Sequence, residues 1–167
     1  MKKRVTILFS TEILLLVIAT GCATMMGAKA TPEMRTYERI IEIPGQTKDQ
    51  MYIRANSWFV ETFNSAESVI EFQDKEAGKI MGKYVFNYAE GVYTYSVKQT
   101  VDISIKDDKV RVIINNPLYK TTSGMGETYY NATYRALETQ KGVERARSEW
   151  SELTTSLENY LQKDDEW

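Results

Sequence analysis

The most reactive side chain in the sequence is the thiol of Cys22, the only cysteine, and the chain contains no histidine. The lack of histidine excludes histidine-based acid–base catalysis, serine–histidine triads and metal sites made of His and Cys ligands. A lone cysteine also cannot form an intramolecular disulfide. The chemistry that remains is modification of the Cys22 sulfur, or catalysis and metal binding by carboxylates.

The residues before Cys22 have the three parts of a secretory signal. A cationic start at 2–4 is followed by an apolar run over 5–19 and by small residues next to the cysteine. The apolar run is about fifteen residues long and contains Glu12, whereas a membrane-spanning helix needs roughly twenty apolar residues. We therefore predict a cleaved leader over 1–21 rather than a permanent transmembrane helix.

The sequence Ala19-Thr20-Gly21-Cys22 resembles the lipobox of bacterial lipoproteins, with Ala19 in the place of the usual leucine. This resemblance implies cleavage before Cys22 and acylation of its sulfur and of its new amino group. Ala23 follows, instead of the aspartate that keeps enterobacterial lipoproteins in the inner membrane, and no acidic run that marks surface export comes after it. The resemblance therefore implies an outer-membrane anchor with the protein on the periplasmic side. Ordinary secretion with a chance cysteine and an uncleaved anchor are the alternatives.

Beyond the leader, the sequence divides into a short linker and one domain. Residues 22–35 are small and polar and include Gly27 and Pro32, which predicts a flexible tether. Residues 36–167 have the length of a single domain. The formal net charge of the chain is −2 and becomes more negative when the basic leader is removed, which argues against nucleic acid as a partner.

The hydrophobic periodicity of 36–167 predicts an α+β domain with the order β-α-β-β-β-β-α. A first helix is expected up to about Ser65 with Thr47 or Asp49 as its cap, and a second helix is expected after Gly142, up to about Leu161. We expect an antiparallel sheet of about five strands, with both helices packed on its apolar face. The predicted strands are 36–43, 69–72, 79–88, 92–105 and 109–115.

Four positions within these elements stand out. Gly82 lies on the apolar face of its strand, which indicates a bulge or the close approach of a helix. Gln99 alone breaks the apolar alternation of the strand 92–105. Trp58 and Phe63 belong to the buried face of the first helix, and the alternative is that they line a ligand pocket.

The clearest candidates for a binding surface are tyrosines, of which the sequence has eleven. Several lie in or beside the connection 117–140, an irregular stretch whose part 129–137 is predicted to be a short helix. Tyrosine combines apolar area with a polar tip and is favoured in recognition surfaces. The alternative is that these rings pack the connection onto the sheet edge. The predicted binding residues are Tyr119, Tyr129, Tyr130 and Tyr134, together with Lys98 and Arg111 on the polar face of the sheet.

Three short motifs could hold a metal or a phosphate, but each has a simpler explanation. Asp107-Asp108 fits the turn of a tight hairpin. The turn that contains Asp74 and Glu76 offers few oxygen ligands for Ca²⁺. The glycine-containing segment 123–126 lacks the lysine of a phosphate-binding loop. We therefore predict no metal and no cofactor.

A second resemblance is carried by 58–63 (WFVETF), 68–70 (SVI), 74–80 (DKEAGKI) and 82–83 (GK). These segments resemble a family of Bacteroidetes lipoproteins that carry a domain of unknown function with a TBP-like fold, over about 43–116. The resemblance implies the same order of elements as the periodicity does. It implies no activity and no catalytic residues. The TBP-like name refers to shape and does not imply DNA binding.

These observations leave three hypotheses for function. The first is a non-enzymatic binding or assembly module, held by lipid on Cys22 and acting on an envelope protein. The second is a carrier with a small-ligand pocket between helices and sheet near Trp58 and Trp150. The third is a hydrolase that uses two facing carboxylates, although no spacing in the sequence suggests such a pair.

The lipid anchor can be tested by intact-mass analysis of the native protein. We expect the leader to be absent and Cys22 to carry acyl chains. One myristoyl chain gives roughly 5–6 kcal/mol of membrane binding, so two or three chains should hold the protein on the membrane durably. An unacylated Cys22 or a retained leader would contradict the prediction.

Overall fold

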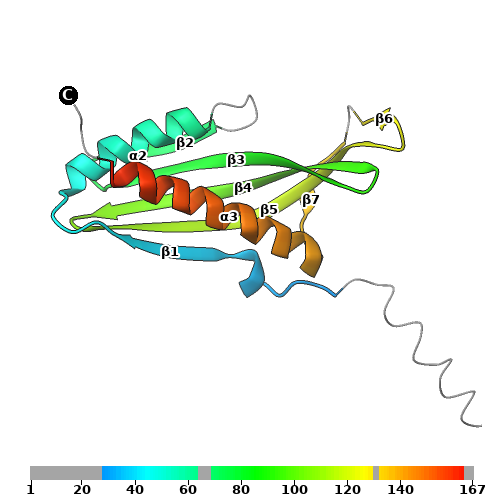
Figure 1. Cartoon of the computed structure of the whole chain (residues 1–167), viewed down its shortest axis with the longest axis horizontal. Helices are drawn as coiled ribbons and strands as arrows, with labels where there is room; N and C mark the ends of the chain where they lie inside the picture. Colours follow the sequence, from blue (N-terminus) through cyan, green and yellow to red (C-terminus); the bar gives the residue numbers. More distant parts are fainter. Residues whose placement is uncertain (1–27, 64–68, 130–131, 164–167) are drawn as a thin grey trace, which may run out of the picture.

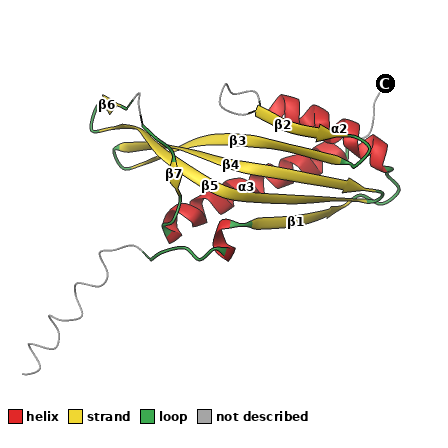
Figure 2. Ribbon diagram, turned by 180° about the vertical axis from the view of Figure 1, so that it is seen from behind, coloured by secondary structure: helices red, strands yellow, loops and turns green. Residues whose placement is uncertain are grey.

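The computed structural model describes residues 28–63, 69–129 and 132–163, which form an antiparallel sheet with two helices on one face (Figure 1, Figure 2). The predicted leader and Cys22 lie outside these residues. Within them, no helix is long and apolar enough to cross a membrane. The elements are η1 (Glu33–Arg35), β1 (Tyr37–Glu42), α2 (Lys48–Thr62), β2 (Val69–Asp74), β3 (Lys79–Glu90), β4 (Tyr93–Lys106), β5 (Lys109–Gly124), β6 (Glu127–Thr128), β7 (Arg135–Ala136) and α3 (Gln140–Leu161).

The sheet has the strand order β1-β5-β4-β3-β2, and the neighbouring strands are antiparallel. Strands β2 to β5 are neighbours in space as they are in sequence, which confirms the predicted meander. Strand β1 lies on the far side of β5, so the strand before the first helix forms one edge of the sheet. The short strands β6 and β7 also pair with β5. The predicted α+β fold class is confirmed.

The core lies between the helices and alternate residues of the central strands. Val101, Ile103 and Ile105 of β4 are at most 2% exposed, as the period-two pattern predicted. The helices contribute Trp58 from α2 and Trp150 from α3, which are 2% and 0% exposed. Full burial of one large apolar side chain contributes roughly 1.5–3 kcal/mol, so these contacts fix both helices on the sheet.

The start of α2 is held by its own cap and by the β4–β5 turn. The hydroxyl of Thr47 accepts from the backbone N–H of Gln50, and the Gln50 side chain accepts from the backbone N–H of Thr47. The Asp107 carboxylate accepts from the backbone N–H of Lys48 at 2.7 Å, at the positive end of the helix dipole. Asp108 has a φ of 63°, as a tight turn requires. The Asp107-Asp108 pair therefore serves the hairpin and the helix start.

Gly82 shows both features that its position predicted. A Cβ at this residue would lie 3.0 Å from the Phe59 ring of α2 and 2.8 Å from the carbonyl oxygen of Val69. The pairing of β2 with β3 also shifts between Ile70 and Phe72. The missing side chain thus lets α2 approach the sheet closely.

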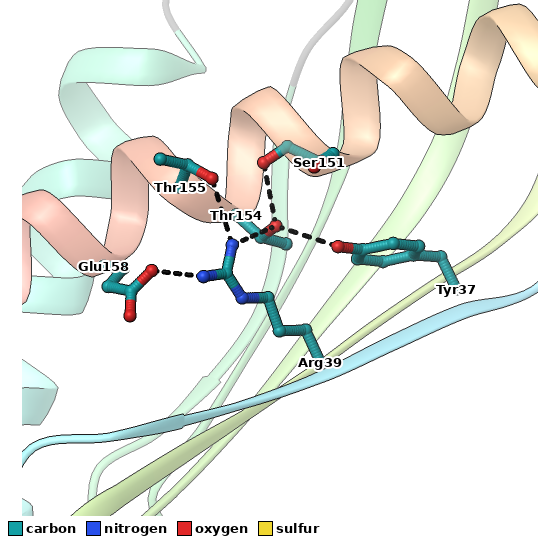
Figure 3. A network of polar contacts seen from close by, with 6 residues as sticks. All are labelled: Tyr37, Arg39, Ser151, Thr154, Thr155 and Glu158. Carbon is teal, nitrogen blue, oxygen red and sulfur yellow. Dashed lines mark hydrogen bonds and ion pairs between the residues drawn. The ribbon is translucent and has the colours of Figure 1, made fainter.

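A polar network joins the edge strand β1 to α3 (Figure 3). The Arg39 guanidinium donates to Thr155 Oγ1 at 3.0 Å and to Thr154 Oγ1 at 3.3 Å, and it forms an ion pair with Glu158. The Tyr37 hydroxyl lies 3.4 Å from Thr154 Oγ1. Because β1 is hydrogen-bonded to the sheet on one side only, these contacts fix its position relative to the helix.

The strand predicted over 109–115 is longer than expected, since β5 continues to Gly124. The continuation passes through a bulge at which Asn116 and Pro117 lie opposite Gln99 of β4. Pro117 has no N–H to donate, and Asn116 has a positive φ of 51°, so a regular ladder could not accept them. The sequence predicted that the strand ends here, because asparagine and proline are usually found at strand ends.

The short helix predicted over 129–137 is wrong, because residues 132–134 are irregular and β7 follows them. Strand β7 pairs with β5 beyond the bulge, and the N–H of Leu137 donates to the carbonyl of Pro117 at 2.9 Å. The extension of β5 offers unpaired backbone groups at its edge, and pairing with them outweighs local helix formation.

We expect Gly82→Ala to destabilise the domain by about 1–3 kcal/mol, because a methyl group would overlap the Phe59 ring and the Val69 carbonyl. Urea unfolding followed by circular dichroism measures this change. Asn87→Ala, at an exposed site on the same strand, is the control and should change stability by less than about 0.5 kcal/mol. Equal stability of the two variants would contradict the proposed close contact.

Candidate binding site

Strands β3, β4 and β5 extend past α3 (Figure 1). A series of aromatic rings runs along the helix side of the sheet toward that end, and it starts beneath the helices, where Tyr84 packs on Phe63. The ring centroids of Tyr88 and Tyr95 lie 5.2 Å apart, and those of Tyr95 and Tyr119 lie 6.2 Å apart. Alternate residues of a strand share one face and meet their cross-strand neighbours, so the period-two spacing builds this series. The aromatic row, as we define it, consists of Tyr84, Phe86, Tyr88, Tyr95 and Tyr119.

Three tyrosines of the aromatic row have raised pKa values. Burial raises the pKa of Tyr84, Tyr88 and Tyr95, and neighbouring carboxylates raise it further. A phenol with a raised pKa stays neutral at physiological pH and can donate a hydrogen bond. The row therefore presents apolar faces with polar, uncharged tips.

Two arginines lie over rings of the aromatic row. The guanidinium of Arg145, on α3, is 5.7 Å from the centroid of Tyr88. The guanidinium of Arg135, on β7, is 5.5 Å from the centroid of Tyr119. Cation–π contacts of this kind contribute about 0.5–1 kcal/mol at exposed sites. They place positive charge beside the rings without the desolvation cost of burying it.

An open groove of about 810 Å³ lies beyond the row, between the end of β5 and the segment that carries β6 and β7. One wall is the ring of Tyr93, which packs so closely on Gly124 that no side chain would fit there. The groove combines rings, hydroxyl groups and one guanidinium, which suits a ligand with both apolar and hydrogen-bonding groups. The distal groove, as we define it, is lined by Tyr93, Thr121, Thr128, Tyr129, Ala132, Thr133 and Arg135.

The predicted residues Lys98 and Tyr134 meet on the opposite face of the sheet. The ammonium of Lys98 is 4.1 Å from the Tyr134 ring centroid, and that of Lys120 is 4.7 Å away. The hydroxyls of Tyr134 and Ser96 lie 3.0 Å apart, and Ser96 is only 3% exposed. Tyr134 thus packs the chain onto the sheet, which was the alternative explanation for the tyrosines.

The other predicted residues are spread over the molecule. Tyr129 lines the distal groove, and Tyr119 belongs to the aromatic row. Tyr130 lies outside the described residues. Arg111 donates from Nε to Glu38 at 2.7 Å, near the β4–β5 turn at the other end of β5. The structure therefore does not bring the six predicted residues into one site, and their role in binding stays a prediction.

Tyr93, Tyr95, Thr121 and Arg135 belong to this region but were not among the predicted binding residues. The alternation of β4 placed both tyrosines on the apolar face, which suggested core positions. The signal available was the length of the predicted strand, since a strand of this length extends beyond what one helix can cover. No sequence pattern indicated a binding role for Thr121 or Arg135, because the position of both residues in the fold depends on the bulge in β5.

The two carboxylates Glu149 and Glu152, which interact electrostatically, do not form a catalytic pair. Burial, and then the charge of Glu152, raises the pKa of Glu149, and both residues lie on α3. Residues three apart on one helix do not face each other across a cleft. Among residues 28–63, 69–129 and 132–163, no group of three or more Asp, Glu, His or Cys residues could hold a metal ion. Asp74 instead accepts from the backbone N–H of Ala77 at 2.8 Å.

These features define an α+β domain in which a meander, an added edge strand and two helices present an aromatic end. A family model described as a domain of unknown function (DUF4468) with TBP-like fold matches residues 37–120. The chain therefore belongs to this family. The match ends within β5, so most of the distal groove lies beyond it.

Two solved structures share the fold. A DUF4468 family protein from Bacteroides ovatus is 14% identical with a TM-score of 0.59, over 85% of this chain and 95% of that one. A TBP-like protein from Parabacteroides distasonis is 11% identical with a TM-score of 0.55, over 74% of this chain and 92% of that one. The comparison with curated proteins gives no match. At these identities the likeness shows the fold alone.

We expect Glu149→Gln to raise the thermal midpoint at neutral pH. Burial raises the folded-state pKa of Glu149 above 4.5, so its contribution to stability is largest below pH 4.5 and is lost as pH rises through the folded pKa. The increase in thermal midpoint caused by the amide of Glu149→Gln should therefore become smaller as the pH falls toward 4.5. Thermal melts across this range, with Glu42→Gln on exposed β1 as the control, measure the effect. A gain that does not depend on pH would contradict it.

Proposed function

We propose that the protein is a non-enzymatic envelope lipoprotein, anchored through acylated Cys22 to the outer membrane on the periplasmic side, and that it acts as a binding or assembly module. The observation that carries the binding role is the distal groove, which joins aromatic faces, threonine hydroxyls and the guanidinium of Arg135. Such a lining recognises a partner by shape and hydrogen bonding. The anchor is supported by the lipobox-like sequence before Cys22.

Recognition fits the groove better than catalysis does. General acid–base catalysis needs a group whose pKa lies near the working pH and within reach of the substrate. In the neighbouring aromatic row, burial raises the pKa of Tyr88 and Tyr95 above the ordinary value of a phenol, which moves both groups away from that range. Tyrosine and arginine are the residues that most often carry binding energy in protein interfaces. An envelope protein that inserts a side chain into the groove is therefore the partner we favour.

A small-ligand carrier is the second candidate, because the volume of the distal groove lies within the usual range of about 300–1,000 Å³ for ligand sites. The sequence had suggested a pocket near Trp58 and Trp150 instead. Both rings are buried in the core, and Trp58 Nε1 donates to Ser156 Oγ at 3.1 Å. Side chains therefore fill that place, and a carrier would use the distal groove.

Affinity capture of the lipidated protein from its native envelope tests the proposed module. We expect a specific partner with the unaltered protein, and loss of that partner with Tyr129→Ala, which removes a groove wall, and with Thr133→Arg, which fills the groove. Val60→Ala is the matched control, because Val60 is an apolar residue of α2 that is 60% exposed.

Equal capture by all variants would show that the groove is not the contact. Capture of no specific protein, together with a groove-dependent thermal shift on adding envelope extract, would favour the carrier. Neither a partner nor a shift would contradict the binding role altogether.

A further inference from the structure

The start of the described chain is fixed beside the first turn of α3. The N–H of Ala30 donates to the carbonyl of Glu138 at 2.7 Å, and the N–H of Gln140 donates to the carbonyl of Ala28 at 2.8 Å. Lys29 and Thr139 form a β-bridge between these two bonds. The point at which the chain leaves the folded domain toward Cys22 is therefore a defined place on its surface.

The distance from that point to the lipid anchor is short. The chain from Cys22 to Ala28 spans at most about 22 Å, at roughly 3.3–3.6 Å per residue. If Cys22 is acylated, as the proposed function states, the start of α3 must lie within this distance of the bilayer. The tether thus limits which surfaces of the domain can reach the membrane.

Two hairpin turns at the same end of the molecule expose apolar side chains. Met125 is 73% exposed and Val92 is 63% exposed, the highest values among the large apolar residues that the structure describes. Tyr93 pairs with Gly124, so Val92 and Met125 each lie one residue beyond the same strand pair, in two different turns. We call these two residues the apolar tip. Single exposed apolar residues are ordinary, but the two most exposed ones here adjoin the two residues of one strand pair.

The apolar tip lies close to the start of the described chain. Lys141, next to Gln140 in the first turn of α3, forms an ion pair with Glu90 at the β3–β4 turn. Val92 is two residues beyond Glu90. Both views of the molecule show the hairpin turns and the start of the described chain at the same end (Figure 1, Figure 2).

We propose that the apolar tip inserts into the interfacial region of the bilayer and seats the domain end-on beside its lipid anchor. Apolar side chains lower their free energy by leaving water for this region, and tyrosines such as Tyr129, 39% exposed nearby, are favoured at its polar boundary. The distal groove then opens at the membrane surface. This inference rests on the proposed lipid anchor.

The contact is apolar rather than electrostatic. Neither residue of the apolar tip carries a charge, and the nearby Lys141 pairs with Glu90. Binding through basic residues weakens as salt screens the charges, whereas apolar insertion does not. The seating should therefore be the same on zwitterionic and anionic lipids.

Spin-label depth measurements on the full lipidated chain in vesicles test this inference. Nitroxides are attached at Val92→Cys or Met125→Cys, since acylated Cys22 does not react. The controls are Ile53→Cys and Val60→Cys on α2, where the native residues are 58% and 60% exposed. The vesicles contain phosphatidylcholine alone or with phosphatidylglycerol.

We expect the tip labels to collide with membrane-dissolved oxygen and to be shielded from a water-soluble nickel chelate, in both lipids and at high salt. The control labels should show the opposite preference. Mass analysis of the same samples that found Cys22 unacylated would overturn the proposed anchor, and this inference with it.

Tip labels that match the controls in acylated protein would overturn the inference alone. Shielding accompanied by dipolar broadening between labels would identify a second copy of the chain at the tip, and would also overturn it. Thermal melts of each labelled variant check that the fold is retained.

Discussion

The constraint on which this structure depends is that two helices must cover one face of a sheet whose central strands are longer than they are. Helix α3 has 22 residues and extends about 33 Å, whereas β5 has 16 residues and extends about 53 Å. Under the helices the sheet is covered by fully buried aliphatic and tryptophan side chains. Beyond them the same face carries half-buried tyrosines, whose rings cover one another and whose hydroxyls reach water.

The part of the sheet that extends beyond the helices links the fold to its proposed role. A surface of phenol rings with raised pKa values and arginines above them is stable in water, yet it retains apolar area that a partner can cover. The distal groove lies in this extended part of the sheet. The two hairpin turns also lie there, at one end of the molecule (Figure 1). Because the strands extend beyond the helices, the binding surface, the start of the described chain and the apolar tip lie at the same end of the molecule.

Several parts of the structure could be predicted because they depend on local periodicity. The alternation around Val101 and the three- and four-residue spacing around Trp150 gave the sheet face and the helix stripe that the structure shows. Gly82 marked a close approach, and Phe59 makes it. The candidate site was harder to predict, because Thr121 and Arg135 reach it only after β5 has continued through its bulge.

The sequence by itself determined the α+β class, the order of the elements and the residues that form the core, because each follows from spacing within a few neighbouring residues. It also supplied the lipobox-like motif at Cys22 on which the proposed anchor rests. Only the tertiary structure decided that Pro117 lies inside a strand, that 135–136 pairs with β5, and that the turns of Val92 and Met125 adjoin one strand pair. Each of these depends on hydrogen bonds between segments far apart in the chain, which no local pattern records.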